Sequence, residues 1–116
     1  MIYLTREAVI EYSLTFPFSY EDYPFDDPNW TVMRRSDTKR GFAWIFEKDG
    51  HIWVNVKAQP DWALFWRDLY PSVLPAYHMN KTHWNSIVLD GSVPDDAVED
   101  MISRSYDLCG KRKHPA

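Results

Sequence analysis

Cysteine is almost absent from this chain of 116 residues. The one cysteine, Cys109, has no partner for an intrachain disulfide, and no CxxC motif or Cys/His zinc pattern surrounds it. A disulfide framework and a zinc finger are therefore excluded, and a reducing compartment is the natural environment. We expect Cys109 to be a small buried apolar residue near a helix end and not a nucleophile.

Long apolar segments are also missing. The N-terminal run MIYLTREAVIEY contains Arg6 and Glu7 and no apolar stretch of signal-peptide length. Nothing approaches the ~20 apolar residues that cross a bilayer. Glycine is scarce, at four residues, and with the abundant aromatic residues this argues against a low-complexity or disordered chain. The sequence predicts one cytoplasmic domain over residues 1–116 with no membrane partner.

Positive charge is in deficit over the whole chain, which has a net charge of −4. A free-standing nucleic-acid-binding protein is more often basic, because phosphate neutralisation supplies much of its affinity. The distribution is uneven, however. Residues 28–89 carry eight basic and five acidic side chains, whereas residues 1–27 carry one basic and six acidic. A locally basic middle segment therefore remains available for an anionic partner.

Aromatic residues are abundant, at 16% of the chain, and many lie in regular patterns. The patterns predict helices over residues 6–15 and 60–70 and from a Ser92 cap to Gly110, and strands over residues 30–35, 42–47, 52–57 and 87–89. Thr5 is expected to cap the first helix, and Asp49-Gly50 to form a hairpin turn. Residues 17–28 are expected to form an ordered loop, and residues 71–75 a turn.

This order of elements, α-β-β-β-α-β-α, predicts an α+β domain: a single antiparallel sheet with helices packed on one side. The second helix carries apolar residues at i, i+3, i+4, i+7 and i+8, which indicates a stripe that packs in the core. Its members are Trp62, Phe65, Trp66, Leu69 and Tyr70. The third helix is expected to bury Val98, Met101, Ile102, Ser105 and Cys109.

Several segments resemble a known family. They are Glu21-Asp22-Tyr23-Pro24-Phe25, the run Tyr77-His78-Met79-Asn80-Lys81-Thr82-His83-Trp84-Asn85, Leu89-Asp90-Gly91-Ser92, Ser105-Tyr106-Asp107-Leu108, and Lys57 followed by Pro60-Asp61-Trp62-Ala63. In these motifs the chain resembles the MmcQ/YjbR family over nearly its whole length. The resemblance implies a small bacterial protein with a compact α+β fold, grouped with frataxin-like (CyaY-like) and secretion-chaperone-like folds. It also implies DNA binding through a double-wing motif of paired hairpins.

The most specific of these motifs contains a polar loop cluster, namely Tyr77, His78, Asn80, His83 and Trp84, with Lys81 among them. Imidazole, ammonium and indole groups together could contact an anion or a nucleotide. The alternative is structural, with His83 and Trp84 packed under the last strand while Asn80 and Lys81 hold a turn. A metal site is disfavoured, because His78 and His83 lie five residues apart without a third ligand.

A second candidate is the basic hairpin, which we define as Arg34, Arg35, Lys39 and Arg40 between the first two strands. Clustered basic side chains suit contact with backbone phosphate. Lys57 and Lys81 complete the expected anion or nucleic-acid contacts, and Lys48 and the tail Lys111–Lys113 are further candidates. The alternative is a solvated hairpin tip.

The acidic loop, which contains Glu21, Asp22, Asp26 and Asp27, could bind a cation or act in acid–base chemistry. We favour a structural role in turns, because these acids lie in a proline-rich loop and not along a helix.

No Ser or Cys nucleophile, glycine-rich phosphate loop or metal cage is present, so we expect no catalytic residue and no cofactor. An enzyme using His78 or His83 as a base, beside Tyr77 or Lys81, remains an alternative. The leading hypothesis is a non-catalytic DNA-binding module. The alternative is a protein-interaction or chaperone-like domain that binds a protein partner or a second copy through an apolar sheet face.

Overall fold

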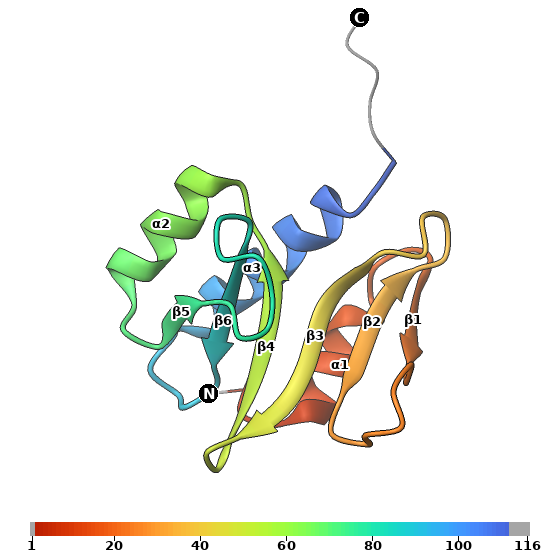
Figure 1. The fold of residues 1–116 in the computed structure, drawn as a ribbon, viewed down its shortest axis with the longest axis horizontal. Coiled ribbons are helices and arrows are strands. Elements are labelled where there is room, and N and C mark those ends of the chain that lie inside the picture. Colours follow the sequence, from red (N-terminus) through yellow and green to blue (C-terminus); the bar gives the residue numbers. More distant parts are fainter. Residues whose placement is uncertain (1, 112–116) are drawn as a thin grey trace, which may run out of the picture.

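The computed structural model describes residues 2–111. Its elements in chain order are α1 (Arg6–Ser13), β1 (Ser19–Asp22), β2 (Thr31–Arg35), β3 (Gly41–Lys48), β4 (His51–Lys57), α2 (Pro60–Leu69), β5 (Val73–Pro75), β6 (Trp84–Val88) and α3 (Asp95–Leu108). The strands form one antiparallel sheet in the order β1-β2-β3-β4-β6-β5. Figure 1 shows α1 and α3 behind this sheet and the β5–β6 loop in front of it. The predicted α+β class is confirmed.

Two strands were not predicted. Residues 19–22 form β1, where the sequence predicted only loop, and residues 73–75 form β5, where it predicted a turn. Both are edge strands of the sheet. Edge strands are often short and carry charge or proline, which weakens the alternation that marks a strand.

The predicted turns and caps are mostly present. Thr5 accepts a hydrogen bond from the Ala8 amide at 3.2 Å and so caps α1. Asp49 and Gly50 have φ values of 53° and 78°, as a tight hairpin turn of the primed type requires. The predicted cap of α3 was wrong. The cap position is Pro94, and the Ser92 hydroxyl instead donates to the Asp90 carboxylate at 2.6 Å.

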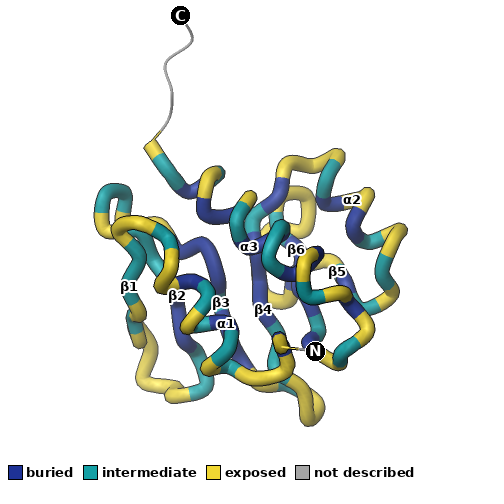
Figure 2. The backbone as a smooth tube through the Cα atoms, turned by 180° about the vertical axis from the view of Figure 1, so that it is seen from behind, coloured by how far each residue is buried: buried dark blue, intermediate teal, exposed yellow. Residues whose placement is uncertain are grey.

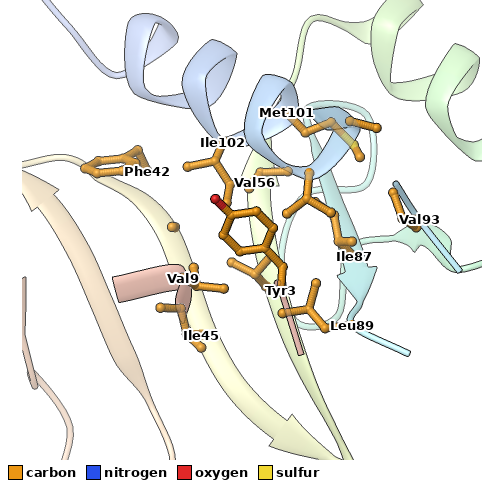
Figure 3. Packing of buried hydrophobic residues seen from close by; sticks show 14 of the residues in the cluster. Tyr3, Val9, Phe42, Ile45, Val56, Ile87, Leu89, Val93, Met101 and Ile102 are labelled. Atoms are coloured by element: carbon orange, nitrogen blue, oxygen red, sulfur yellow. The ribbon is translucent and has the colours of Figure 1, made fainter. Parts of the chain in front are cut away.

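The main core lies between the helices and one face of the sheet (Figure 3). It contains Val9 of α1, Trp66 of α2 and the inner face of α3, packed on β3, β4 and β6. All five residues predicted to line α3 are buried, including Cys109. Figure 2 views the molecule from the helix side, where most of β2 and β3 and the segment 54–56 of β4 are buried. Among residues 2–111, no helix has the length and apolar content needed to cross a bilayer.

The apolar stripe of α2 is only partly core, which corrects the prediction. Trp66 is 7% exposed, but Phe65 and Leu69 are 49% and 50% exposed. The physical reason is the position of α2 at one end of the sheet, where it packs against β5 and β6. A three-residue strand such as β5 cannot cover a whole helix face.

Candidate functional site

The face of the sheet away from the helices carries an aromatic groove of about 490 Å³. We use this name for the hollow lined by Phe25, Asp27, Trp30, Trp44, His78 and Met79. Two loops form its walls. One joins β1 to β2, and the other joins β5 to β6 and lies in front of the sheet in Figure 1.

The floor of the groove is a second layer of packed rings. Trp30 stacks on Phe46 with the ring centroids 4.4 Å apart, and Tyr77 stacks on Phe46 at 5.5 Å. Trp44 lies against Gly41, where an added β-carbon would come within 2.8 Å of the Trp44 Nε1 atom. The Trp44 indole donates to the Gly41 carbonyl at 3.2 Å. A side chain at position 41 would therefore collide with both Trp44 and Val32, whose Cγ1 atom would lie 2.6 Å from the added β-carbon.

The first wall, residues 23–30, is fixed by Asn29. The Asn29 side chain imitates a backbone amide, since it accepts from the Glu47 N–H at 2.8 Å and donates to the Glu47 carbonyl at 3.0 Å. Arg6 of α1 donates to the Asn29 carbonyl at 2.7 Å. The Asp27 carboxylate accepts from the Asn29 amide at 2.9 Å. The wall is thus tied to the sheet and to α1.

The second wall begins at Tyr77, whose backbone is held by two buried polar side chains. Asn55 donates to the Tyr77 carbonyl at 2.9 Å, and the Tyr77 amide donates to the Ser86 hydroxyl at 2.9 Å. The Ser86 hydroxyl in turn donates to the Asn55 side-chain oxygen. Asn55 and Ser86 are fully buried, so this closed network fixes where the loop leaves the sheet.

The far end of the same loop is held by α2. Arg67 donates to the Asn85 side chain at 2.7 Å and to the backbone carbonyls of Lys81 and Trp84. Asn85, which is buried, donates to the Ala63 carbonyl of α2 at 3.1 Å. Neither end of the wall therefore depends on its exposed side chains.

The structure separates the members of the polar loop cluster. Tyr77 and His78 lie together, with ring centroids 4.0 Å apart, and His78 has a left-handed backbone with φ 62°. Asn80 holds a turn, because its side-chain oxygen accepts from the amides of Thr82 and His83 at 2.9 and 3.3 Å. Only His78 of the cluster lines the aromatic groove.

The other members, and the lysines grouped with them, are placed elsewhere. Lys81 and His83 are exposed, and Trp84 begins β6. Lys57 lines a separate cleft of about 170 Å³ between α2 and α3. The expected anion contacts Lys57 and Lys81 therefore do not share one pocket.

The basic hairpin lies against the C-terminal end of α3. Three of its donors reach the last carbonyls of that helix region: Arg35 to Tyr106 at 3.0 Å, Thr38 to Cys109 at 2.7 Å and Arg40 to Gly110 at 3.1 Å. The last turn of α3 has no basic residue of its own. Because the C-terminal end of a helix carries a partial negative charge, the hairpin acts as its cap from a distant part of the chain.

The hairpin arginines are also paired with carboxylates. Arg35 forms two hydrogen bonds to Asp37 at 2.9 and 3.0 Å and stacks over the Tyr106 ring. The hydrogen bonds to Arg35 lower the pKa of Asp37. Arg34 points to the other face of the sheet, where it pairs with Asp22 at 2.6 Å and lies over Trp44 at 5.6 Å. The predicted tail extends beyond the described residues, since only Lys111 of Lys111–Lys113 belongs to them.

The acidic loop enters turns and ion pairs, in agreement with the structural role that we favoured. Asp22 pairs with Arg34, Asp27 caps the Asn29 amide, and Glu21 accepts from the Tyr23 hydroxyl at 2.7 Å, which raises the pKa of Tyr23. Within residues 2–111, no cluster of three His, Cys, Asp or Glu side chains could hold a metal ion.

Cys109 is enclosed between α3 and β3. Burial raises the pKa of its thiol, which lies 3.5 Å from the Gly41 carbonyl. The thiol is therefore protonated near neutral pH and acts as a packed apolar group.

With this geometry in place, comparison with known proteins gives the family. The YjbR family model matches residues 14–108. The chain belongs to the YjbR family. It is 35% identical to the uncharacterized protein YjbR of Escherichia coli K12, over 89% of this chain and 85% of that protein. It is 32% identical to the uncharacterized protein YyaQ of Bacillus subtilis, over 90% of this chain and 98% of that protein.

Solved structures of similar YjbR-type fold agree with this assignment. Protein DR2400 of Deinococcus radiodurans superposes with a TM-score of 0.84 and 28% identity, over 93% of this chain and 80% of that one. A protein from Pseudomonas syringae gives a TM-score of 0.81 and 26% identity, over 92% of this chain and all of that one.

Two of the motifs by which the chain resembles this family lie on opposite sides of the aromatic groove. Phe25 ends the first motif, and His78 and Met79 belong to the second. Sequence reasoning did not find that the two meet, nor the roles of Asn55 and Ser86. One signal was available, because Asn55 is a polar residue between the β-branched residues Val54 and Val56 in the interior of a strand.

Proposed function

We propose that this YjbR-family chain is a protein-binding module, and that the aromatic groove receives a side chain and flanking backbone of a partner protein. The observation that carries this proposal is a preformed groove to which two of the family motifs contribute, through Phe25 from one and His78 and Met79 from the other. Phe25 leaves 49% of its surface exposed at the rim. Partly exposed Trp and Phe rings that are held in a fixed position are frequent anchors of protein interfaces.

The rigidity of the groove supports binding of a partner without large rearrangement. Its walls are fixed by buried amides and arginines, so few groups need to be ordered when a partner arrives. The hollow is open on one side, which suits a segment of a larger molecule that continues beyond it.

Selection from a random peptide display library tests the proposal. Enriched peptides are titrated against the parent protein, Phe25→Ala and Phe65→Ala. The last variant is a matched control, because Phe65 is equally exposed, at 49%, but lies on α2 away from the groove. We expect Phe25→Ala to weaken binding about tenfold or more and Phe65→Ala to leave it unchanged. Failure to enrich any peptide, or equal binding by both variants, would contradict the proposal.

DNA binding through the basic hairpin is the second candidate function. It is supported by Lys39 and Arg40, which are exposed at the end of the hairpin. The ion pairs of Arg34 and Arg35 and the contacts to α3 leave fewer free charges for phosphate than the sequence indicates. For this reason we rank DNA binding below protein binding.

A gel-shift series with random-sequence duplex DNA tests this second candidate. A DNA-binding protein should shift the duplex at low salt, and its affinity for the duplex should fall steeply as the salt concentration rises. The double variant Lys39→Ala/Arg40→Ala should then bind more weakly. If no shift occurs at low salt, or if the double variant behaves as the parent does, DNA binding through this hairpin is excluded.

A further inference from the structure

The rings of the aromatic groove are arranged around Phe25. Its centroid lies 6.3 Å from that of Trp30, with the planes at 76°, and 6.3 Å from that of Trp44, with the planes at 35°. Three rings that face different directions can surround one small group from several sides. Because the face of an aromatic ring carries negative potential, such an arrangement attracts a cation.

Cations of the protein itself already lie over rings at both ends of this sheet face. At one end, Arg34 lies over Trp44. At the other end, the Lys48 ammonium lies 5.1 Å from the Trp53 centroid and 5.4 Å from that of Tyr77. Each cation is also paired with a carboxylate, Arg34 with Asp22 and Lys48 with Asp49. The combination of ring and carboxylate is thus repeated on this face.

The part of the groove lined by Phe25 and Trp30 has ring and carboxylate without a cation from the described residues, whereas Trp44 in the same lining already lies under Arg34. Phe25 and Trp30 have no cation over their rings among the described residues, and Asp27 supplies a carboxylate to the groove lining. One Asp27 oxygen accepts from the backbone N–H of Asn29 at 2.9 Å, which fixes the direction of the carboxylate. Its other oxygen is available to a ligand at this exposed position.

We propose that the aromatic groove binds an arginine side chain of the partner, with the guanidinium against Phe25 and Trp30 and paired with Asp27. This inference rests on the proposed protein-binding function and names its anchor. Arginine fits better than lysine, because a planar, weakly hydrated guanidinium stacks on rings and forms a directed pair with a carboxylate. An anionic anchor would be repelled by Asp27. A neutral one would desolvate Asp27 without replacing its hydrogen bonds to water.

The test compares Nα-acetyl-arginine methylamide with Nα-acetyl-citrulline methylamide, which has nearly the same shape but no charge. Both are titrated by NMR into isotope-labelled protein. We expect the arginine compound to shift the indole N–H signals of Trp30 and Trp44 but not those of Trp62 and Trp66. We expect the citrulline compound to bind about tenfold more weakly.

Two carboxylate variants refine the test. Asp27→Asn keeps an oxygen that can accept from the Asn29 amide but removes the charge, so it should abolish the preference for arginine over citrulline. Asp26→Asn is the matched control. It removes the neighbouring exposed charge, which does not line the groove, and should leave the preference intact.

The outcomes separate this inference from the proposed function. If display-selected peptides bind through Phe25 but arginine and citrulline bind equally, or neither binds, the groove takes an uncharged anchor and the inference is wrong while protein binding stands. If no peptide binds through Phe25, the protein-binding function itself fails. An arginine preference that Asp27→Asn leaves unchanged would also overturn the inference.

Discussion

Arg35, predicted as a contact for an anionic ligand, makes structural contacts in the fold through its charged side chain. Its side chain is only 13% exposed and bonds to Asp37 and to the Tyr106 carbonyl. We therefore expect Arg35→Ala to lower the free energy of unfolding by about 2 kcal/mol. Lys39→Ala, an exposed control on the same hairpin, should change it by less than about 0.5 kcal/mol. Urea denaturation at neutral pH measures both, and equal midpoints would contradict the role of Arg35 as a cap.

The role of Arg35 could not be predicted from its local sequence. A run of basic residues between two strands usually marks an exposed turn. Its partner carbonyl at Tyr106 lies 71 residues further along the chain. Only the packing of α3 across the sheet brings the two together.

Asp90 is a second residue whose surroundings predict a measurable effect. Hydrogen bonds from Ser72 and Ser92 lower the pKa of Asp90 from 3.8 to about 2. A carboxyl with a lower pKa in the folded state stabilises the protein above its unfolded pKa, and this stabilisation is lost as pH falls through the folded pKa. The contribution of Asp90 should therefore disappear between about pH 4 and pH 2.

Asp90→Asn provides the measurement for this effect. The parent should be more stable than the variant near pH 5, and the difference should shrink as pH falls to 2. Urea unfolding at a series of pH values gives the difference directly. A difference that stays constant over this range would show that the carboxylate charge is not responsible.

At the scale of elements, α2 has two unlike apolar sides. Trp66 packs in the core, whereas Phe65 beside it is half exposed. Trp66→Ala should lower the free energy of unfolding by about 3–5 kcal/mol because it empties a large buried volume. Phe65→Ala should lower it by about 1 kcal/mol or less. Thermal or urea unfolding of the two variants tests this, and equal losses would place both rings in the core.

The sequence predicted all three helices and the strands β2, β3 and β4, placed β6 at residues 87–89 where the structure has Trp84–Val88, and missed the edge strands. Central strands such as β3 and β4 alternate aromatic or β-branched residues with a period of two. β1 reads Ser-Tyr-Glu-Asp and β5 reads Val-Leu-Pro, so neither shows this alternation. Acidic residues and proline at an edge also hinder pairing with another chain. The acidic residues and the proline that protect these edge strands therefore also remove the alternating pattern by which a strand is recognised in the sequence.

At the scale of the whole molecule, the groove depends on sheet topology. Phe25 and His78 are more than 50 residues apart in sequence, and each lies in a loop whose length and composition reveal nothing of the other. They line one hollow because the two loops extend toward each other across β3 and β4, which lie between the strands that carry them. The sequence motifs therefore point to Phe25 and His78 separately. Only the order of the strands in the sheet shows that the two residues line the same groove.

The contact between the basic hairpin and α3 has a consequence for the speed of folding and unfolding. Strands β1 to β4 are neighbours in sequence as well as in the sheet, so they can pair by closing short loops. The helix cap joins residues about 70 apart and is expected to form after the folding barrier is crossed.

Arg35→Ala should then speed unfolding roughly thirtyfold and leave the folding rate nearly unchanged, whereas Val54→Ala in β4 should slow folding. Stopped-flow kinetics over a range of urea concentrations would measure both rates. A slower folding rate in Arg35→Ala would mean that α3 is already docked at the barrier. If the folding rate is unchanged, the contact between the basic hairpin and α3 determines how long the native state persists before it unfolds.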